Sequence, residues 1–184
     1  MVPAGLWFGD SPRSGHSPTR MTDITLPTGT MPHPLNPLRL AWHARNAWHR
    51  IARPLTIGVR AIILDGDRVL LIRHSYVPGW HLPGGGVDKR ETLVEAVRRE
   101  VREEVGLALE TARPFGVFAR FRHGASDHVA VFVAECWSGE PRIDRFEITQ
   151  AAFFPLDRLP EDTTPATRRR LAEFLGNKPL DEHW

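Results

Sequence analysis

A glycine-rich loop followed by a sharply delimited helix constrains this chain more than any other feature of its sequence. The loop spans residues 83–86 and has the sequence Pro-Gly-Gly-Gly. Thr92 stands three residues before Glu95, which is the spacing of a capping box, so a helix is expected to begin there. Gly106 is the residue type that ends helices in the left-handed conformation. The sequence therefore predicts a helix over residues 92–105, which the glycine-rich loop precedes.

Carboxylates gather along one flank of this predicted helix. At about 100° per residue, its four valines form an apolar stripe that indicates a buried face. Glu100 and Glu104 lie at the margin of that stripe, one turn apart, with Glu103 just beyond them. Like charges at this spacing cost about 0.2–0.5 kcal/mol per pair in a helix, and a hard divalent cation reverses that cost. A solvated acidic face balanced by neighbouring arginines is the alternative.

The wider pattern matches a known motif. Gly85, Glu91 and the run from Arg99 to Leu107 fit G-x5-E-x7-R-E-U-x-E-E-x-G-U, in which U is a bulky aliphatic residue. This is the Nudix box with every fixed position filled, and the chain resembles a Nudix (MutT-like) hydrolase over residues 55–176. Residues 80–86 and 147–160 are similar to the elements that flank the box in this family.

The resemblance carries one departure. Lys89 and Arg90 stand where many members of the family have a glycine just before the first glutamate. We expect this to change the turn and to affect substrate access without touching an expected ligand.

The resemblance implies an α/β protein with the Nudix fold, an α/β/α sandwich around a mixed sheet. It also implies metal-dependent hydrolysis of a diphosphate linkage in a nucleoside diphosphate derivative, by attack of water at phosphorus. A nucleoside triphosphate, ADP-ribose or a nucleotide sugar would each fit that class. The alternative is a sensor of the same fold that binds a nucleotide derivative without cleaving it, but the intact box argues against a pure binder.

The family's metal ligands carry over to the glutamate flank. The resemblance implies that Mg²⁺ or Mn²⁺ is held by Glu100, Glu103 and Glu104, with help from the carbonyl of Gly84. The helix periodicity independently selects the pair Glu100 and Glu104, so the two arguments agree.

The catalytic groups also follow from the resemblance. Glu100 or the distant Glu147 would activate water, and the family does not agree on which of the two positions does so. Arg99 would orient Glu100. Three further positions of the box are expected to be structural, namely Gly85, Glu91 and Gly106.

Candidate substrate contacts are less specific. Four side chains could meet phosphates or a base: Arg60, Arg73, Arg122 and Trp80. Surface salt bridges are the alternative for the arginines, and packing of the loop is the alternative for the tryptophan. Four histidines lack the spacing of a zinc site and are expected at the surface or at a pocket rim: His74, His81, His123 and His128.

The remaining elements are mainly strands. Residues 56–64 and 68–73 flank the turn Asp-Gly-Asp and predict a hairpin. Later strands are expected at residues 115–122, 128–136 and 151–154, and Thr164 followed by Pro165 predicts a final helix over residues 166–175. Cys136 ends an apolar run and is expected in the core. A mixed sheet covered by helices is the fold class that this order favours.

The ends of the chain differ from its centre. Residues 1–37 hold seven of the 16 prolines and are expected to be disordered. Residues 38–54 predict an amphipathic helix that packs on the domain, with a membrane surface or a partner chain as the alternative. The Nudix domain is expected over residues 55–176, and a C-terminal tail over residues 177–184.

Charge and composition limit the partners. The net charge of +2 combines +4 in residues 1–54 with −2 in the remainder, so stable nucleic-acid binding by the domain is not expected. A single cysteine excludes an internal disulfide, and no apolar run is long enough for a transmembrane segment. We expect a cytoplasmic protein with a small nucleotide substrate, and a homodimer is left open.

Overall fold

The computed structural model describes residues 55–122, 125–143 and 146–184. The tail expected over residues 1–37 and the helix expected over residues 38–54 lie outside these residues, as does His123. The backbone of Arg122 is described, but its side chain is not.

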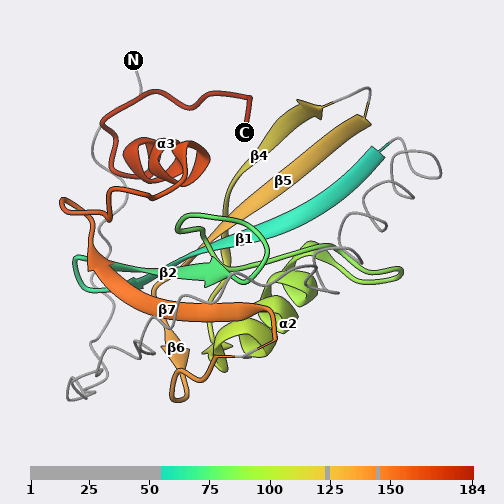
Figure 1. Ribbon diagram of the computed structural model, residues 1–184. Helices are drawn as coiled ribbons and strands as arrows, with labels where there is room; N and C mark the ends of the chain where they lie inside the picture. The colour runs from blue at the N-terminus through green and yellow to red at the C-terminus, as the bar shows by residue number, and fades with distance from the viewer. Residues whose placement is uncertain (1–54, 123–124, 144–145) are drawn as a thin grey trace, which may run out of the picture.

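A mixed sheet of five strands forms the centre of the described structure (Figure 1). Its order is β4-β5-β1-β2-β7, and only β1 and β5 run parallel to each other among these neighbours. A short two-stranded ladder of β3 and β6 lies beside it. The strands are β1 (Leu55–Asp65), β2 (Arg68–His74), β3 (Ala108–Leu109), β4 (Arg113–Arg122), β5 (Ala125–Ala134), β6 (Trp137–Ser138) and β7 (Ile148–Pro155).

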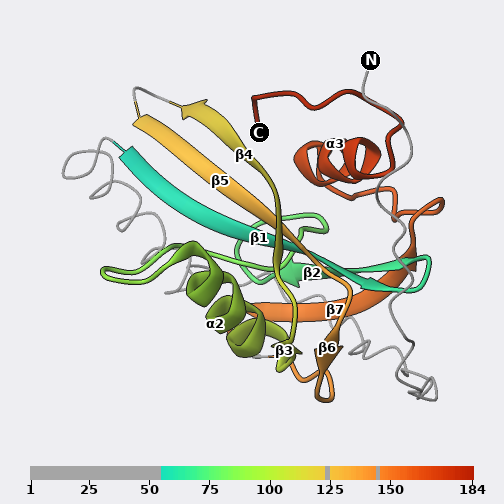
Figure 2. The same ribbon diagram turned by 180° about the vertical axis from the view of Figure 1, so that it is seen from behind.

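Two helices cover opposite faces of the sheet, as Figures 1 and 2 show together. Alternate residues of β1 enter two separate cores, because successive side chains of a strand point to opposite faces. Val59 belongs to the core under α2 (Leu93–Val105), whereas Ile62 belongs to the core under α3 (Pro165–Phe174). The expected α/β/α sandwich around a mixed sheet is confirmed.

The expected hairpin forms only beside its turn. β1 and β2 pair at Leu64–Val69 and Asp65–Arg68, and then the two strands separate. The glycine-rich loop lies in the gap: Val59 N donates to Gly85 O (2.8 Å), and on the other side Ile72 pairs with His81. The loop is therefore bonded to strands on both of its sides.

The prediction that Cys136 lies in the core is wrong. β5 ends at Ala134, and Cys136 is exposed in the connection to β6. Cys136 stands two residues after Ala134, at the spacing that would keep it on the same face of the strand, so alternation alone extended the strand too far.

The residues expected as a C-terminal tail lie along β4. Ala119 N donates to Glu182 O (2.7 Å), and Trp184 N donates to Ala119 O (2.8 Å). Arg170 of α3 is fully buried, with its guanidinium carbon 3.8 Å above the centre of the Phe118 ring and 5.8 Å from that of Trp184. The chain end is thus bonded to the sheet edge and packs against α3. No helix among the described residues has the length and apolar character needed to cross a membrane.

Candidate active site

Helix α2 positions the acidic residues, and its ends lie where the sequence predicts them. The Thr92 side chain accepts a bond from Glu95 N while the Glu95 carboxylate accepts one from Thr92 N, a complete capping box. Gly106 ends the helix with φ 71°, in the left-handed region. The caps fix where the helix begins and ends, and its buried valines fix its rotation about its axis. Val101 is buried, which places the flank with Glu100 and Glu104 against the glycine-rich loop.

The glycine-rich loop approaches the sheet and α2 too closely for side chains. Gly84 has φ 132°, and a Cβ there would lie 2.2 Å from Val59 O. At Gly85 a Cβ would lie 2.4–2.6 Å from the carboxylate atoms of Glu100. The absence of a side chain at Gly85 therefore lets the carboxylate of Glu100 rest directly on the loop backbone.

Glu104 is the buried member of the acidic group. Its residue is only 5% exposed, and one carboxylate oxygen accepts a hydrogen bond of 2.7 Å from Gly84 N. Burial raises the pKa of Glu104 to about 8, and the charges of Glu100 and Glu147 add to that rise, while Arg60 and the Gly84 amide oppose it. A carboxylate in this environment is stable as an anion only where positive charge compensates it.

Arg99 joins the outer acids of the site to the loop. Its guanidinium binds both oxygens of Glu91 (2.8 and 2.9 Å), one oxygen of Glu100 (2.9 Å) and one of Glu103 (3.2 Å). It also donates to the carbonyl of Gly86 (3.0 Å). These carboxylates, Glu91 first, raise the pKa of Arg99 above its ordinary value, so it stays charged.

The two partners of Arg99 respond differently. The hydrogen bond from Arg99 lowers the pKa of Glu91, whose other contact is the amide of Asp88 (2.9 Å). Burial raises the pKa of Glu100 despite the same arginine. Glu91 thus connects the turn to the helix through Arg99 and Asp88, whereas Glu100 is a partly desolvated carboxylate beside the loop.

The acids lie along one edge of α2 but are not gathered around a common point. Within the described ranges, no three His, Cys, Asp or Glu side chains are close enough to form a ready metal site. Arg99 holds Glu100 and Glu103, and the Gly84 amide holds Glu104. Glu147, directly before β7, is exposed, and it is near enough for its charge to raise the pKa of Glu104.

The chemistry of this donor set fits a hard divalent cation. All its candidate side-chain ligands are carboxylates, which Mg²⁺ and Mn²⁺ prefer. Burial raises the pKa values of Glu100 and Glu104, so both carboxylates are poorly solvated as anions. A cation at this edge would supply the missing charge.

The candidate substrate contacts separate into two groups. Trp80 is only 7% exposed and packs edge to face against Phe154, with ring centres 4.7 Å apart. The guanidinium carbon of Arg73 lies 4.9 Å from the centre of the Trp80 ring. Arg73 also pairs with Asp162. These two residues therefore pack and brace the loop. Arg60 is half-buried, and no carboxylate among the described residues lies within ion-pair distance of it.

A pair of histidines that the sequence placed at the surface lies close to Arg60. The rings of His74 and His81 are 5.3 Å apart, brought together by the pairing of Ile72 with His81. Burial, together with the charges of Arg60 and His81, lowers the pKa of His74 to about 3. Burial also lowers the pKa of His81. His74 therefore remains neutral beside the arginine at physiological pH. The two histidines meet only because the loop lies between β1 and β2, and this long-range arrangement is not visible in the sequence pattern.

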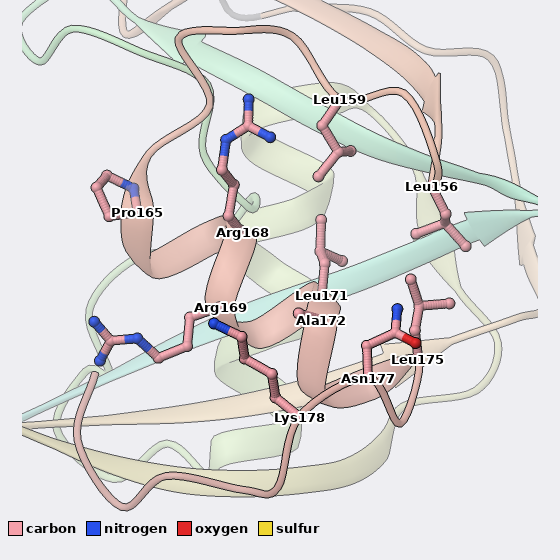
Figure 3. Close-up of a pocket in the computed structure, with 10 residues that line it drawn as sticks. All are labelled: Leu156, Leu159, Pro165, Arg168, Arg169, Leu171, Ala172, Leu175, Asn177 and Lys178. Carbon is pink, nitrogen blue, oxygen red and sulfur yellow. The ribbon is translucent and has the colours of Figure 1, made fainter.

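A hollow lies away from this site, beside α3. About 530 Å³ of space lies along the outer side of α3, with leucines on its floor and basic side chains around it (Figure 3). Its lining contains no acid, so it lacks the chemistry of the α2 edge. The lining residues are Leu156, Leu159, Pro165, Arg168, Arg169, Leu171, Ala172, Leu175, Asn177 and Lys178.

Comparison with known proteins agrees with this fold and motif. A Bacillus subtilis protein provisionally assigned as an 8-oxo-dGTP diphosphatase is 31% identical over 120 residues, 65% of this chain and 79% of that protein. The NAD-capped RNA hydrolase NudC of Salmonella typhi is 33% identical over 150 residues, 77% of this chain but 56% of that protein. The MutT Nudix hydrolase from Burkholderia pseudomallei superposes with a TM-score of 0.60 at 37% identity, covering 64% of this chain and 95% of that one.

The family itself is settled by a direct match. The sequence model of the NUDIX domain matches residues 54–174, which is well over half of the chain. The resemblance seen in the sequence is confirmed: this protein belongs to the Nudix hydrolase family.

Proposed function

We propose that this protein is a metal-dependent pyrophosphohydrolase that cleaves a diphosphate linkage in a small nucleoside diphosphate derivative. The observation that carries the proposal is the Glu104 carboxylate, buried against the amide of Gly84 with Glu100 on the adjacent loop backbone. Burying two carboxylates side by side costs stability unless a cation shares the charge. The name of the Bacillus subtilis relative, a diphosphatase, belongs to the same reaction class.

Mg²⁺ or Mn²⁺ is the cation that we propose for this edge. Glu100, Glu103 and Glu104 would hold it, together with the carbonyl of Gly84. When bound, such a cation neutralises phosphate oxygens and lowers the pKa of a coordinated water. A diphosphate would otherwise be repelled by the acidic flank of α2, so we expect substrate binding to require the metal.

The remaining steps belong to the side chains of this chain. Arg99 positions Glu100 through the 2.9 Å contact between them. Glu100 or Glu147 accepts the proton of the attacking water, because a carboxylate within hydrogen-bond reach can act as general base. Arg60 binds phosphate oxygens of the substrate, a role supported by its half-burial and by the neutral histidines beside it. Arg122 stays a predicted contact.

Replacing Glu104 by glutamine tests the proposal. Glu104→Gln should lower Mg²⁺-dependent phosphate release by 100-fold or more, because the charge at the buried ligand is lost while its shape is kept. Thermal unfolding should show an intact fold, since the amide oxygen of glutamine can still accept the bond from Gly84. Glu135→Gln removes an exposed carboxylate from the end of β5 and is the matched control.

The substrate is identified by a panel assay. Nucleoside triphosphates, ADP-ribose, NADH, dinucleoside polyphosphates and coenzyme A would each be incubated with Mg²⁺ and with Mn²⁺. Cleavage of any member by the wild type and not by Glu104→Gln supports the enzyme. Binding of a nucleotide without cleavage of any member would instead support the sensor.

A further inference from the structure

Four large apolar side chains stand exposed at one end of the sheet. They are Leu55 and Ile57 of β1, which are 57% and 45% exposed, and Val117 and Phe121 of β4, which are 60% and 64% exposed. We call these four residues the sheet-end patch. Burial of large apolar side chains is favourable, so a group of them exposed on one face indicates a surface that something covers.

Strand register places all four side chains on the same face. Leu55 pairs with Ser126, which pairs on its other side with Phe121. Four residues further along each strand, Val59 pairs with Ala130, which pairs with Val117. Residues directly opposite each other in a sheet point to the same side. Val59 and Ala130 belong to the core under α2, so the sheet-end patch continues that face.

Helix α2 stops short of this patch. Its main packing partners among the strands are β1 of the central sheet and β3 of the two-stranded ladder, and not β4. Both Figure 1 and Figure 2 show β1, β4 and β5 extending past the end of α2. The α2 face therefore has a covered half and an uncovered half, and in the uncovered half Ser126 and His128 of β5 lie between the apolar residues of β1 and β4.

We propose that residues 38–52 of this chain cover the sheet-end patch. The patch begins at Leu55, so only Arg53 and Pro54 separate it from that segment. A tether of two residues gives the segment a very high effective concentration at this face. The sequence of the segment predicts a helix whose apolar side includes Leu38, Trp42 and Trp48.

The dimensions agree with this occupant. Fifteen helical residues span about 22 Å at 1.5 Å per residue, whereas the distance from β1 across β5 to β4 is two strand spacings, about 10 Å. The segment is thus long enough to cross the patch from β1 to β4. With its tryptophans on the sheet, its basic residues Arg39 and Arg50 would face solvent.

A covered patch would also border the active site. Val87 N donates to Ile57 O (3.2 Å), and Gly86 pairs with Gly58, so the loop after the glycines runs along the same stretch of β1. The segment would therefore hold β1 in place beside the turn that leads to α2.

Thiol reactivity in the full chain tests the proposal. Cys136→Ser removes the native exposed thiol, and Val117→Cys then reports on the patch. Leu180→Cys is the matched control, because Leu180 is 61% exposed in the described structure and Val117 is 60% exposed. If residues 38–52 cover the patch, a maleimide should react at least tenfold more slowly at position 117 than at position 180.

Substitutions in the segment identify the occupant. Trp42→Ser with Trp48→Ser should restore the rate at position 117 to that at position 180, while Arg39→Ser with Arg50→Ser should leave the protection in place. Equal rates at the two positions in the parent protein would overturn the proposal, and so would protection that survives the tryptophan changes. Protection that disappears on dilution, together with a dimer mass in light scattering, would assign the patch to a second copy and also overturn it.

Discussion

Gly85 is the residue whose missing side chain matters most for the site. A Cβ there would fall 2.4–2.6 Å from the Glu100 carboxylate, which would have to swing away from the loop. Its backbone is not left-handed, so Gly85→Ala should fold with little loss of stability and lower the Mg²⁺-dependent rate about tenfold or more. Gly86→Ala is the control, because a Cβ at Gly86 meets nothing within 4 Å. Equal rates for the two variants would show that the position of the Glu100 carboxylate against the loop does not affect catalysis.

His74 makes stability depend on pH. Its pKa is lowered from 6.5 to about 3, chiefly by burial. Between these two pH values the unfolded chain binds a proton at His74 and the folded protein does not. The free energy of unfolding should therefore fall as the pH drops from 6.5 toward 3, by up to about 1.4 kcal/mol per pH unit from this group.

His74→Phe keeps a ring of similar size and removes the titration. Urea unfolding between pH 7 and pH 4 should show a shallower loss of stability for this variant than for the wild type. His183→Phe, at an exposed position, is the comparison. The same steep loss in His74→Phe would mean that other groups cause it.

The turn between the glycine-rich loop and α2 contains a strained element. Arg90 has φ 63°, in the left-handed region that favours glycine, so the substitution seen in the sequence puts a side chain into a conformation that costs about 1–2 kcal/mol. Arg90→Gly should raise the free energy of unfolding by about 0.5–1 kcal/mol, because the greater freedom of glycine in the unfolded chain offsets part of the gain. Chemical denaturation would measure it, and a loss of stability would show that the Arg90 side chain is itself stabilising.

Helix α2 could be predicted closely, whereas its surroundings could not. The capping box at Thr92 and the ending at Gly106 are local patterns that need no knowledge of the rest of the chain. The three contacts that define the site join distant residues: Arg99 with Gly86, Glu104 with Gly84, and Gly85 with Val59. They depend on the loop entering the gap between β1 and β2, which periodicity does not reveal. The exposure of Cys136 also escaped prediction, because the point where β5 ends depends on how the strands pair.

The whole molecule should gain stability from the cation that the site requires. A ligand that binds only the folded state stabilises it by about 2.7 kcal/mol at 100 times its Kd. Mg²⁺ should raise the melting temperature of the wild type by several degrees and leave that of Glu104→Gln nearly unchanged. Calorimetry with Na⁺ at matched ionic strength controls for screening. An equal rise in both proteins would place the binding elsewhere.

The loop that occupies the gap between β1 and β2 has a consequence for motion. Val59 and Ala61 donate to Gly85 and Pro83 as they would to a neighbouring strand, so this part of the site is anchored to the centre of the sheet. Opening it would break these backbone hydrogen bonds to β1, which lies in the centre of the sheet. Adjustment to different substrates must therefore come from the periphery, where the turn around Arg90 and the stretch before β7 can shift without breaking the sheet. In such a molecule the bond-breaking centre stays rigid, and selectivity can diversify around it.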